Sequence, residues 1–218
     1  MKRLLILLPL LFLGCVPPPP AENPVTVVVT GPVGFYPSAL GADWVYQPLG
    51  ASPSDPPYRL SILGPATFDN KSATKFRFAG RGQERYYYRQ MGADGVKLLG
   101  LEEAITRSVT RFNPPMLEYP PESLMNAGYK WGGSTRYETS ILLPDNKIEL
   151  RRDTFQYTYT VIEKAQREVP GGSFQVFRIK LELEDGKGNK EEQEIWFVPN
   201  VGEVRTREGL LLVDRNFK

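Results

Sequence analysis

The feature that most limits how this chain can fold is the alternation of apolar and polar residues in one short segment after another. In residues 154–162 (TFQYTYTVI) and 177–184 (FRIKLELE), apolar side chains occupy every second position. Successive side chains of a β-strand point to opposite faces, so a period of two places the apolar residues of a segment on one face. Turn signals such as Gly80-Arg81-Gly82, Asp94-Gly95 and residues 185–189 (DGKGN) separate the segments. The pattern predicts consecutive β-hairpins.

Helix signals are few. Residues 121–128 begin with Pro and end with Gly, which predicts one or two helical turns, and residues 98–105 are a second, weaker helix candidate. We count about nine to eleven strands and no β-α-β rhythm, so a parallel α/β fold is not expected. The expected fold is therefore all-β, a single curled antiparallel meander (half-barrel or barrel-like) with at most one or two short helices.

The N-terminus predicts an export signal. Lys2 and Arg3 precede an apolar stretch over residues 4–13. Such a stretch is shorter than the roughly 20 residues that a membrane-spanning helix needs, and it is typical of a secretory signal peptide. The chain's only cysteine, Cys15, follows directly after Gly14.

Residues 11–15 (LFLGC) resemble the lipobox of bacterial lipoproteins, whose usual form is Leu, a small residue, Gly or Ala, then Cys. Gly14-Cys15 fits, whereas Phe12 and Leu13 replace the commonest residues. The resemblance implies that Cys15 becomes the mature N-terminus and is the site of lipid attachment, with a thioether-linked diacylglycerol and usually an amide-linked third chain such as palmitate. Two or more acyl chains anchor a protein stably to a membrane. The alternative is an ordinary signal peptide with an incidental cysteine.

Residues 16–24 (VPPPPAENP) follow this site and cannot pack a core. Their prolines favour an extended polyproline II spacer of about 3.1 Å per residue. We therefore divide the chain into a signal peptide (1–14), a lipidated cysteine with a Pro-rich tether (15–24) and a single β domain (25–218). Val16 follows Cys15 where enteric lipoproteins retained in the inner membrane have Asp. The expected location is the cell envelope, at the outer membrane (periplasmic side or surface) if the host has one.

Charge and composition exclude several functions. Loss of residues 1–14 leaves 25 basic and 25 acidic residues, so the mature domain lacks the basic footprint of a nucleic-acid binder. The chain has no histidine, which excludes Ser-His-Asp and Cys-His nucleophile systems and His-ligated metals. A single cysteine excludes an intramolecular disulfide. We expect no catalytic residue, no metal and no cofactor, and the carboxylates Glu118, Glu138 and Glu203 are the first to test for residual catalysis.

The chain is rich in aromatic residues, with 11 Tyr, 11 Phe and 3 Trp. Aromatic side chains commonly fill β-cores, but a curled sheet also presents them on a concave face that holds a ligand. The candidate cavity residues are Trp44, Tyr46, Tyr86, Tyr88, Trp131, Tyr157, Tyr159 and Trp196.

Two segments share the form Tyr-Pro, Gly, then Trp: residues 35–46 (FYPSALGADWVY) and 119–131 (YPPESLMNAGYKW). They indicate either an internal duplication or two loops, fixed by Pro and Gly, that each deliver a Trp to the core. Together with residues 195–204 (IWFVPNVGEV), the first segment resembles a loose group of secreted bacterial β-proteins of unassigned function. The architecture this implies is near the curled antiparallel sheet of the LolA/LolB-like lipoprotein carriers. No binding residue follows from that likeness, because the sequence shows no clear lid helices.

These observations predict a membrane-anchored envelope lipoprotein that is not an enzyme and acts as a binding or structural module. Its expected partners are the membrane, through the N-terminal lipid, and an envelope protein or wall component. One alternative is a carrier of lipid or lipoprotein in an aromatic-lined cavity. Another is a carboxylate-dependent glycan hydrolase.

The lipid anchor gives the first testable prediction. Replacing Cys15 by Ala removes the only thiol to which the diacylglycerol can be attached, so the variant should leave the detergent phase in phase-separation assays. A variant that still partitions into detergent as the wild type does would contradict the lipoprotein assignment.

Overall fold

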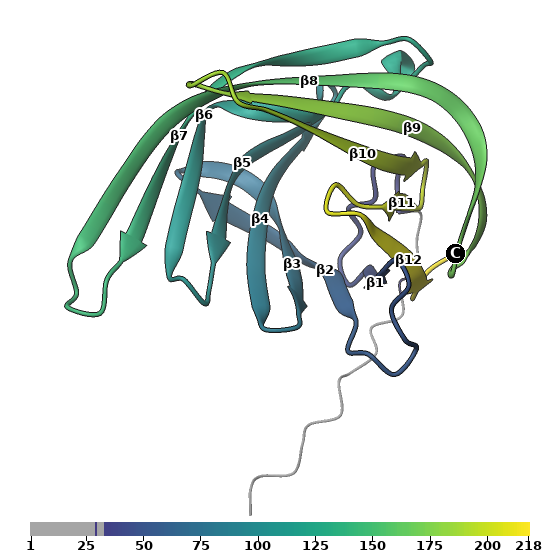
Figure 1. Ribbon diagram of the computed structural model, residues 1–218, viewed down its shortest axis with the longest axis horizontal. Coiled ribbons are helices and arrows are strands. Elements are labelled where there is room, and N and C mark those ends of the chain that lie inside the picture. The colour runs from purple at the N-terminus through teal and green to yellow at the C-terminus, as the bar shows by residue number, and fades with distance from the viewer. Residues whose placement is uncertain (1–28, 30–32) are drawn as a thin grey trace, which may run out of the picture.

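The computed structural model describes residue 29 and residues 33–218, which form an all-β structure (Figure 1). One short 3-10 helix, η1 (Glu122–Leu124), lies between the sixth and seventh strands. The described part of the chain contains twelve strands: β1 (Asp43–Pro48), β2 (Tyr58–Phe68), β3 (Lys71–Gly80), β4 (Gln83–Gly92), β5 (Gly95–Glu103), β6 (Ser108–Tyr119), β7 (Lys130–Leu142), β8 (Ile148–Val169), β9 (Gly172–Asp185), β10 (Lys190–Val198), β11 (Gly202–Arg205) and β12 (Leu210–Arg215).

The strands form one closed antiparallel barrel. Each strand pairs with its neighbours in the sequence, and β1 also pairs with β12, with Trp44 opposite Arg215. The predicted antiparallel barrel-like meander is confirmed, and it has twelve strands rather than nine to eleven. Because consecutive strands run in opposite directions, all the β1–β2, β3–β4, β5–β6, β7–β8, β9–β10 and β11–β12 turns lie at one end of the barrel. We call this the mouth end and the opposite end the narrow end.

Two long strands form one wall of the barrel. β8 has 22 residues and β9 has 14, and Figure 1 shows both curving around one side of the molecule. Their pairing register shifts between Val161 and Glu163. A bulge of this kind adds a residue to one strand and bends it. The bulge therefore helps a strand of this length to follow the curvature of the barrel.

The two predicted helices had different outcomes. Residues 122–124 form the short helix η1 within the predicted range. The prediction for residues 98–105 was wrong, because residues 95–103 are strand β5. Leu98 packs in the barrel interior, whereas Leu99 packs on the outer face against Phe68 and Tyr88. A strand that is buried on both faces has consecutive apolar residues and so loses the alternation that would identify it.

The narrow end is closed by aromatic side chains. The two Tyr-Pro segments meet there, since the Tyr36 hydroxyl donates to the Pro120 carbonyl oxygen at 2.5 Å and its ring lies 5.2 Å from that of Tyr119. Both rings contact Phe197. Trp44 lies near the start of β1 and Trp131 near the start of β7, six strands later in a barrel of twelve. The internal duplication stays a hypothesis that this spacing agrees with.

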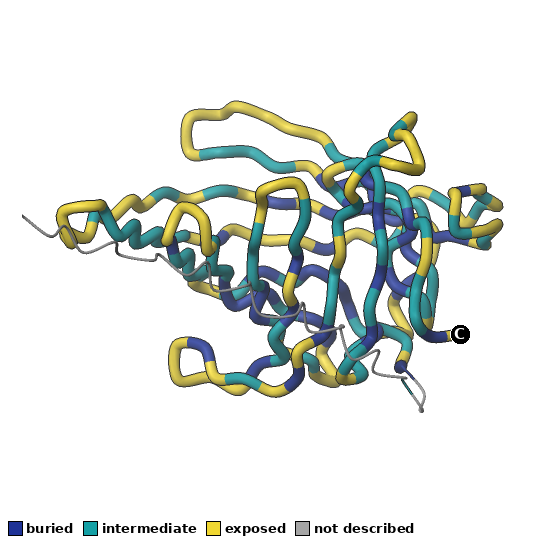
Figure 2. The backbone as a smooth tube through the Cα atoms, turned by 90° about the horizontal axis from the view of Figure 1, so that it is seen from below, coloured by how far each residue is buried: buried dark blue, intermediate teal, exposed yellow. Residues whose placement is uncertain are grey.

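Figure 2 shows exposed residues gathered at the hairpin ends and buried residues within the strands. A second, smaller cluster of Phe68, Ala73, Tyr88 and Leu99 lies on the outer face of β2 to β5. No helix in the described residues is long and apolar enough to cross a membrane. The signal peptide, Cys15 and the tether lie outside the described residues.

Two neighbouring glycines of β7 give a matched test of the β7–β8 packing. A Cβ added at Gly132 would lie 2.1 Å from the main-chain oxygen of Tyr157, whereas one at Gly133 would lie 3.6 Å from the Tyr157 hydroxyl. Gly132→Ala should therefore destabilise the barrel by about 1–3 kcal/mol, because a backbone must shift. Gly133→Ala should be neutral or stabilising by up to about 1 kcal/mol, because it restricts the unfolded chain. Urea unfolding measures both, and equal losses would contradict the packing described.

Candidate ligand cavity and buried ion cluster

The barrel interior contains two adjoining cavities. The wide chamber has a volume of about 750 Å³ and lies toward the mouth end, and the narrow chamber has about 80 Å³ and lies toward the narrow end. Tyr87, Arg207 and Glu208 line both chambers. These three residues therefore mark the boundary between them.

The wide chamber has apolar walls and a polar rim. The rim includes Asp185 at the end of β9, Asn189 in the β9–β10 turn and Lys190 at the start of β10. The apolar wall comes from β5, β6, β8 and β9 and includes Leu98, Leu101, Phe112, Met116, Phe155 and Leu181. The chamber thus combines an apolar wall with polar groups at its rim and at its inner boundary.

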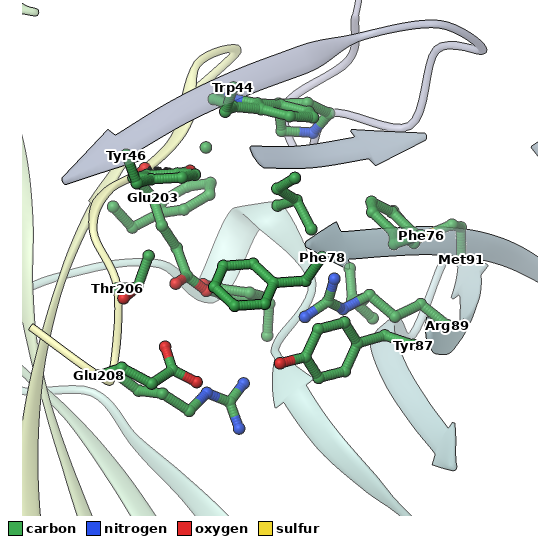
Figure 3. Close-up of a pocket in the computed structure, with 17 residues that line it drawn as sticks. Trp44, Tyr46, Phe76, Phe78, Tyr87, Arg89, Met91, Glu203, Thr206 and Glu208 are labelled. Carbon is green, nitrogen blue, oxygen red and sulfur yellow. Dashed lines mark hydrogen bonds between the residues drawn. The ribbon is translucent and has the colours of Figure 1, made fainter. Parts of the chain in front are cut away.

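The narrow chamber is lined mainly by aromatic rings. Figure 3 shows Trp44, Tyr46, Phe76 and Phe78 around it, with the Arg89 side chain directed into the same space. The Tyr46 hydroxyl donates to the main-chain oxygen of Glu203 at 2.8 Å. A volume of this size holds only a few water molecules or a small polar group.

A buried ion cluster separates the chambers. Glu118 of β6 is 1% exposed and accepts hydrogen bonds from two guanidinium groups. Arg89 of β4 reaches its Oε2 at 2.6 Å through Nε, and Arg207 reaches its Oε1 at 2.5 Å through Nη2. A second contact runs from Arg89 Nη2 to Oε1 at 3.5 Å. Both oxygens of the Glu118 carboxylate are therefore used.

The two arginines decide the ionisation of Glu118. Burial on its own would raise the pKa of the Glu118 carboxyl, but the charges and hydrogen bonds of Arg89 and Arg207 outweigh burial and lower it to about 2. A buried carboxylate is stable only when its charge is compensated in this way. Glu118 is therefore held ionised at every pH near neutral.

Glu203 of β11 has the opposite environment. Its Oε1 accepts a hydrogen bond from the Tyr119 hydroxyl, and no lysine or arginine of the described residues forms an ion pair with it. Burial raises the pKa of the Glu203 carboxyl above its usual value, although Arg207 and Arg89 act in the other direction. Two carboxylates in one cluster thus have pKa values that their surroundings push apart.

Arg207 reaches the cluster because of the turn that contains it. β11 has only four residues, and it pairs with β12 through one register pair, Arg205 with Leu211. The Thr206 amide donates to the Leu210 carbonyl oxygen at 2.9 Å, and Gly209 has a φ of 78° that favours glycine. The tight β11–β12 turn therefore places Arg207 and Glu208 at the boundary of the two chambers.

The structure separates the eight predicted cavity residues into three groups. Trp44 and Tyr46 line the narrow chamber. Trp131, Tyr157 and Tyr159 lie in the interior core and line neither chamber. The rings of Trp131 and Tyr159 stack with their centroids 5.0 Å apart, and the Tyr157 hydroxyl accepts a hydrogen bond from the Leu117 amide at 2.9 Å.

The third group lies on the outer face. Tyr88 belongs to the outer cluster, Tyr86 packs against it, and the Trp196 indole donates to the Glu194 carboxylate at 2.5 Å. Tyr87 is the β4 tyrosine that faces the interior, together with Arg85 and Arg89. The alternation of β4 correctly separates these two faces. The alternation does not identify the inner face. The face with two tyrosines was predicted to be the inner one, but it is the outer face, and the face with one tyrosine lies inside.

Sequence reasoning found part of the ion cluster. Glu118 and Glu203 were two of the three carboxylates chosen for testing, and the structure brings them together, whereas Glu138 is on the surface and pairs with Arg152 at 2.6 Å. Arg89 and Arg207 were not identified. For Arg89 a signal existed, because an arginine on the same strand face as a buried tyrosine requires a buried partner.

No family model, no curated protein and no solved structure matches this chain. In the described residues, no group of three or more Asp, Glu, His or Cys side chains is placed to hold a metal ion. The properties of the cavity and of the ion cluster therefore have to be interpreted from their own chemistry.

Glu118 and Glu203 differ in environment, which gives a prediction for two matched variants. Glu118→Gln should destabilise the barrel by about 3–5 kcal/mol at pH 7, because Arg89 and Arg207 lose the charge that compensates them. Glu203→Gln should change stability by less than about 1 kcal/mol or increase it, because its ionisation at pH 7 opposes folding and a Gln oxygen still accepts from Tyr119. Urea unfolding followed by circular dichroism measures both.

The pH dependence of unfolding provides the control for this comparison. The pKa of Glu118 is lower in the folded than in the unfolded state, so its contribution is present above the unfolded pKa and is lost as the pH falls from about 5 toward about 2. Glu118→Gln should flatten this part of the profile and Glu203→Gln should not. Equal losses of stability in the two variants would show that the ion cluster is not the cause.

Proposed function

We propose that this protein is a non-enzymatic envelope lipoprotein, anchored through Cys15, that binds a small amphipathic molecule in the wide chamber of its barrel. The single observation behind the proposal is that chamber, with its volume of about 750 Å³ and its apolar wall. Of the functions considered from the sequence, this one is closest to the carrier type.

The size and chemistry of the chamber support binding of a small molecule. Ligand pockets commonly have volumes of about 300–1,000 Å³, mostly apolar walls and a few polar groups that orient the ligand. The wide chamber has Leu, Phe and Met side chains on its wall and Arg207 at its inner boundary. A molecule with a hydrocarbon part and a polar group satisfies both surfaces.

The position of the N-terminal segment agrees with an anchored binding module. Residues 33–42 lead into β1 at the narrow end, where Phe35 and Tyr36 contact Phe197. The mouth of the wide chamber is at the other end of the barrel. The described residues that precede β1 therefore leave the mouth accessible to an envelope partner or to a membrane.

The ion cluster does not favour the hydrolase alternative. A general acid near neutral pH needs a raised pKa, and the pKa of Glu118 is lowered to about 2 by Arg89 and Arg207. Glu203 has a raised pKa, but it lies in the narrow chamber, which is far smaller than a sugar-binding cleft requires.

Filling the chamber tests the proposal. The chain from residue 15 onward with Cys15→Ala has no lipid, so an uncharged fluorescent dye such as 1-naphthylphenylamine can be titrated without detergent. Leu183→Trp on the chamber wall should weaken dye binding about tenfold or more, because the indole occupies the space that the dye needs. Ile162→Trp on the exposed face of β8 is the matched control and should bind as the parent does.

Two results would contradict the proposal. The first is a parent protein that does not bind the dye, and the second is equal binding by the two tryptophan variants. Native mass spectrometry of the lipidated protein, purified from membranes, adds an independent measurement, because a bound small molecule appears as an added mass that Leu183→Trp should remove.

A further inference from the structure

Arg207 has more hydrogen-bonding capacity than the protein uses. Its guanidinium group has five N–H donors, and its side chain makes one hydrogen bond to the described part of the chain, from Nη2 to Glu118 Oε1. The side chain is 20% exposed, and the exposed part lines both chambers. The other donors of Arg207 therefore have no protein acceptor among the described residues, in a side chain that lines both chambers.

Arg207 shares its ion-pair partner with a second arginine. One carboxylate, Glu118, is shared by two guanidinium groups, and Arg89 makes two of the three contacts to it. The Glu203 carboxylate is engaged by the Tyr119 hydroxyl, and burial opposes its ionisation by raising its pKa. Glu208 is exposed and forms no ion pair within the described residues. Within the described residues, Arg207 therefore has one ion-pair partner, Glu118, and it shares this partner with Arg89.

A second unsatisfied donor lies in the same region. The Tyr159 side chain is 1% exposed, and its hydroxyl has no hydrogen-bond partner among the described residues. Tyr159 is close enough to Arg207 for the two groups to affect each other's pKa. A buried hydroxyl without a partner costs free energy, but Tyr159 lines neither chamber, so Arg207 is the donor that a ligand in the wide chamber contacts.

We propose that Arg207 binds the carboxylate head group of an amphiphilic acid whose hydrocarbon chain lies in the wide chamber. This inference rests on the proposed function, since it names the class of molecule that the chamber holds. A carboxylate supplies two acceptor oxygens in the planar geometry that a guanidinium group matches, and it gives Arg207 a partner that Arg89 does not share. The apolar wall that begins next to Arg207 then contacts the chain.

Three short amphiphiles test the inference on the detergent-free Cys15→Ala chain from residue 15 onward. Octanoate, 1-octanol and octylammonium have the same hydrocarbon chain and differ in the charge of the head group. Each is titrated against the bound uncharged dye. Octanoate should displace the dye at a concentration about tenfold or more below that needed for 1-octanol, and octylammonium should be the weakest.

Two arginine variants of the same hairpin identify the residue responsible. Arg207→Gln should remove the preference for octanoate over 1-octanol and leave dye binding within about threefold of the parent, because the dye has no charge. Arg205→Gln is the matched control, since Arg205 is directed to the outer face, where it donates to the Glu194 carbonyl oxygen at 2.7 Å. Its ligand preferences should equal those of the parent.

The outcomes distinguish the inference from the proposed function. If the parent binds the dye but octanoate and 1-octanol displace it equally well, or octylammonium displaces it best, the carboxylate site is overturned. The chamber is then still a ligand site. A preference for octanoate that persists in Arg207→Gln also overturns the carboxylate site. If Arg207→Gln does not fold, the three-ligand series on the parent chain decides the charge preference by itself. A parent that does not bind the dye removes the proposed function and the inference together.

Discussion

The pairing of β1 with β12 is the interaction on which the rest of this structure depends. Without it the meander would have two exposed edges, and unpaired strand edges invite pairing with other chains. With it, every strand has two neighbours and the sheet encloses an interior. The pairing is also short, since β1 and β12 have six residues each, whereas β8 has 22. β8 and β9 form the longest part of the barrel wall, and the short strands β1 and β12 close the barrel.

A closed sheet of twelve strands encloses more space than its aromatic side chains fill. The narrow end is packed by Tyr36, Tyr119 and Phe197, and the ion cluster lies between this packed end and the wide chamber. Glu118 connects β4, β6 and the β11–β12 turn through Arg89 and Arg207. A buried ion pair contributes little net stability compared with apolar packing, but it fixes which partners meet. The cluster therefore sets where the packed core ends and where the wide chamber begins.

The sequence predicted the fold class because the alternation in segments such as residues 154–162 and 177–184 depends only on local geometry. It failed for β5, where burial on both faces removes the alternation at Leu98 and Leu99. It also separated Tyr86 and Tyr88 from Tyr87 without identifying the inner face. That choice depends on which residues of β2 and β5 cover the sheet from outside, such as Phe68, and this is a tertiary contact. The ion cluster joins residues 89, 118 and 207, whose proximity follows only from the closed barrel.

The position of the polar group within the barrel also determines how a ligand would be oriented. Arg207 lies at the inner boundary of the wide chamber and the polar rim lies at its mouth, so an amphiphile bound through its head group points its chain toward the mouth. Exposed apolar side chains occur at the turns of that same end, among them Leu49, Ile105 and Ile148. A chain too long for the chamber would emerge between these turns rather than into water alone. The same apolar turns would meet a membrane or partner surface first, so the ligand would enter with its polar end leading and leave with its hydrocarbon end leading.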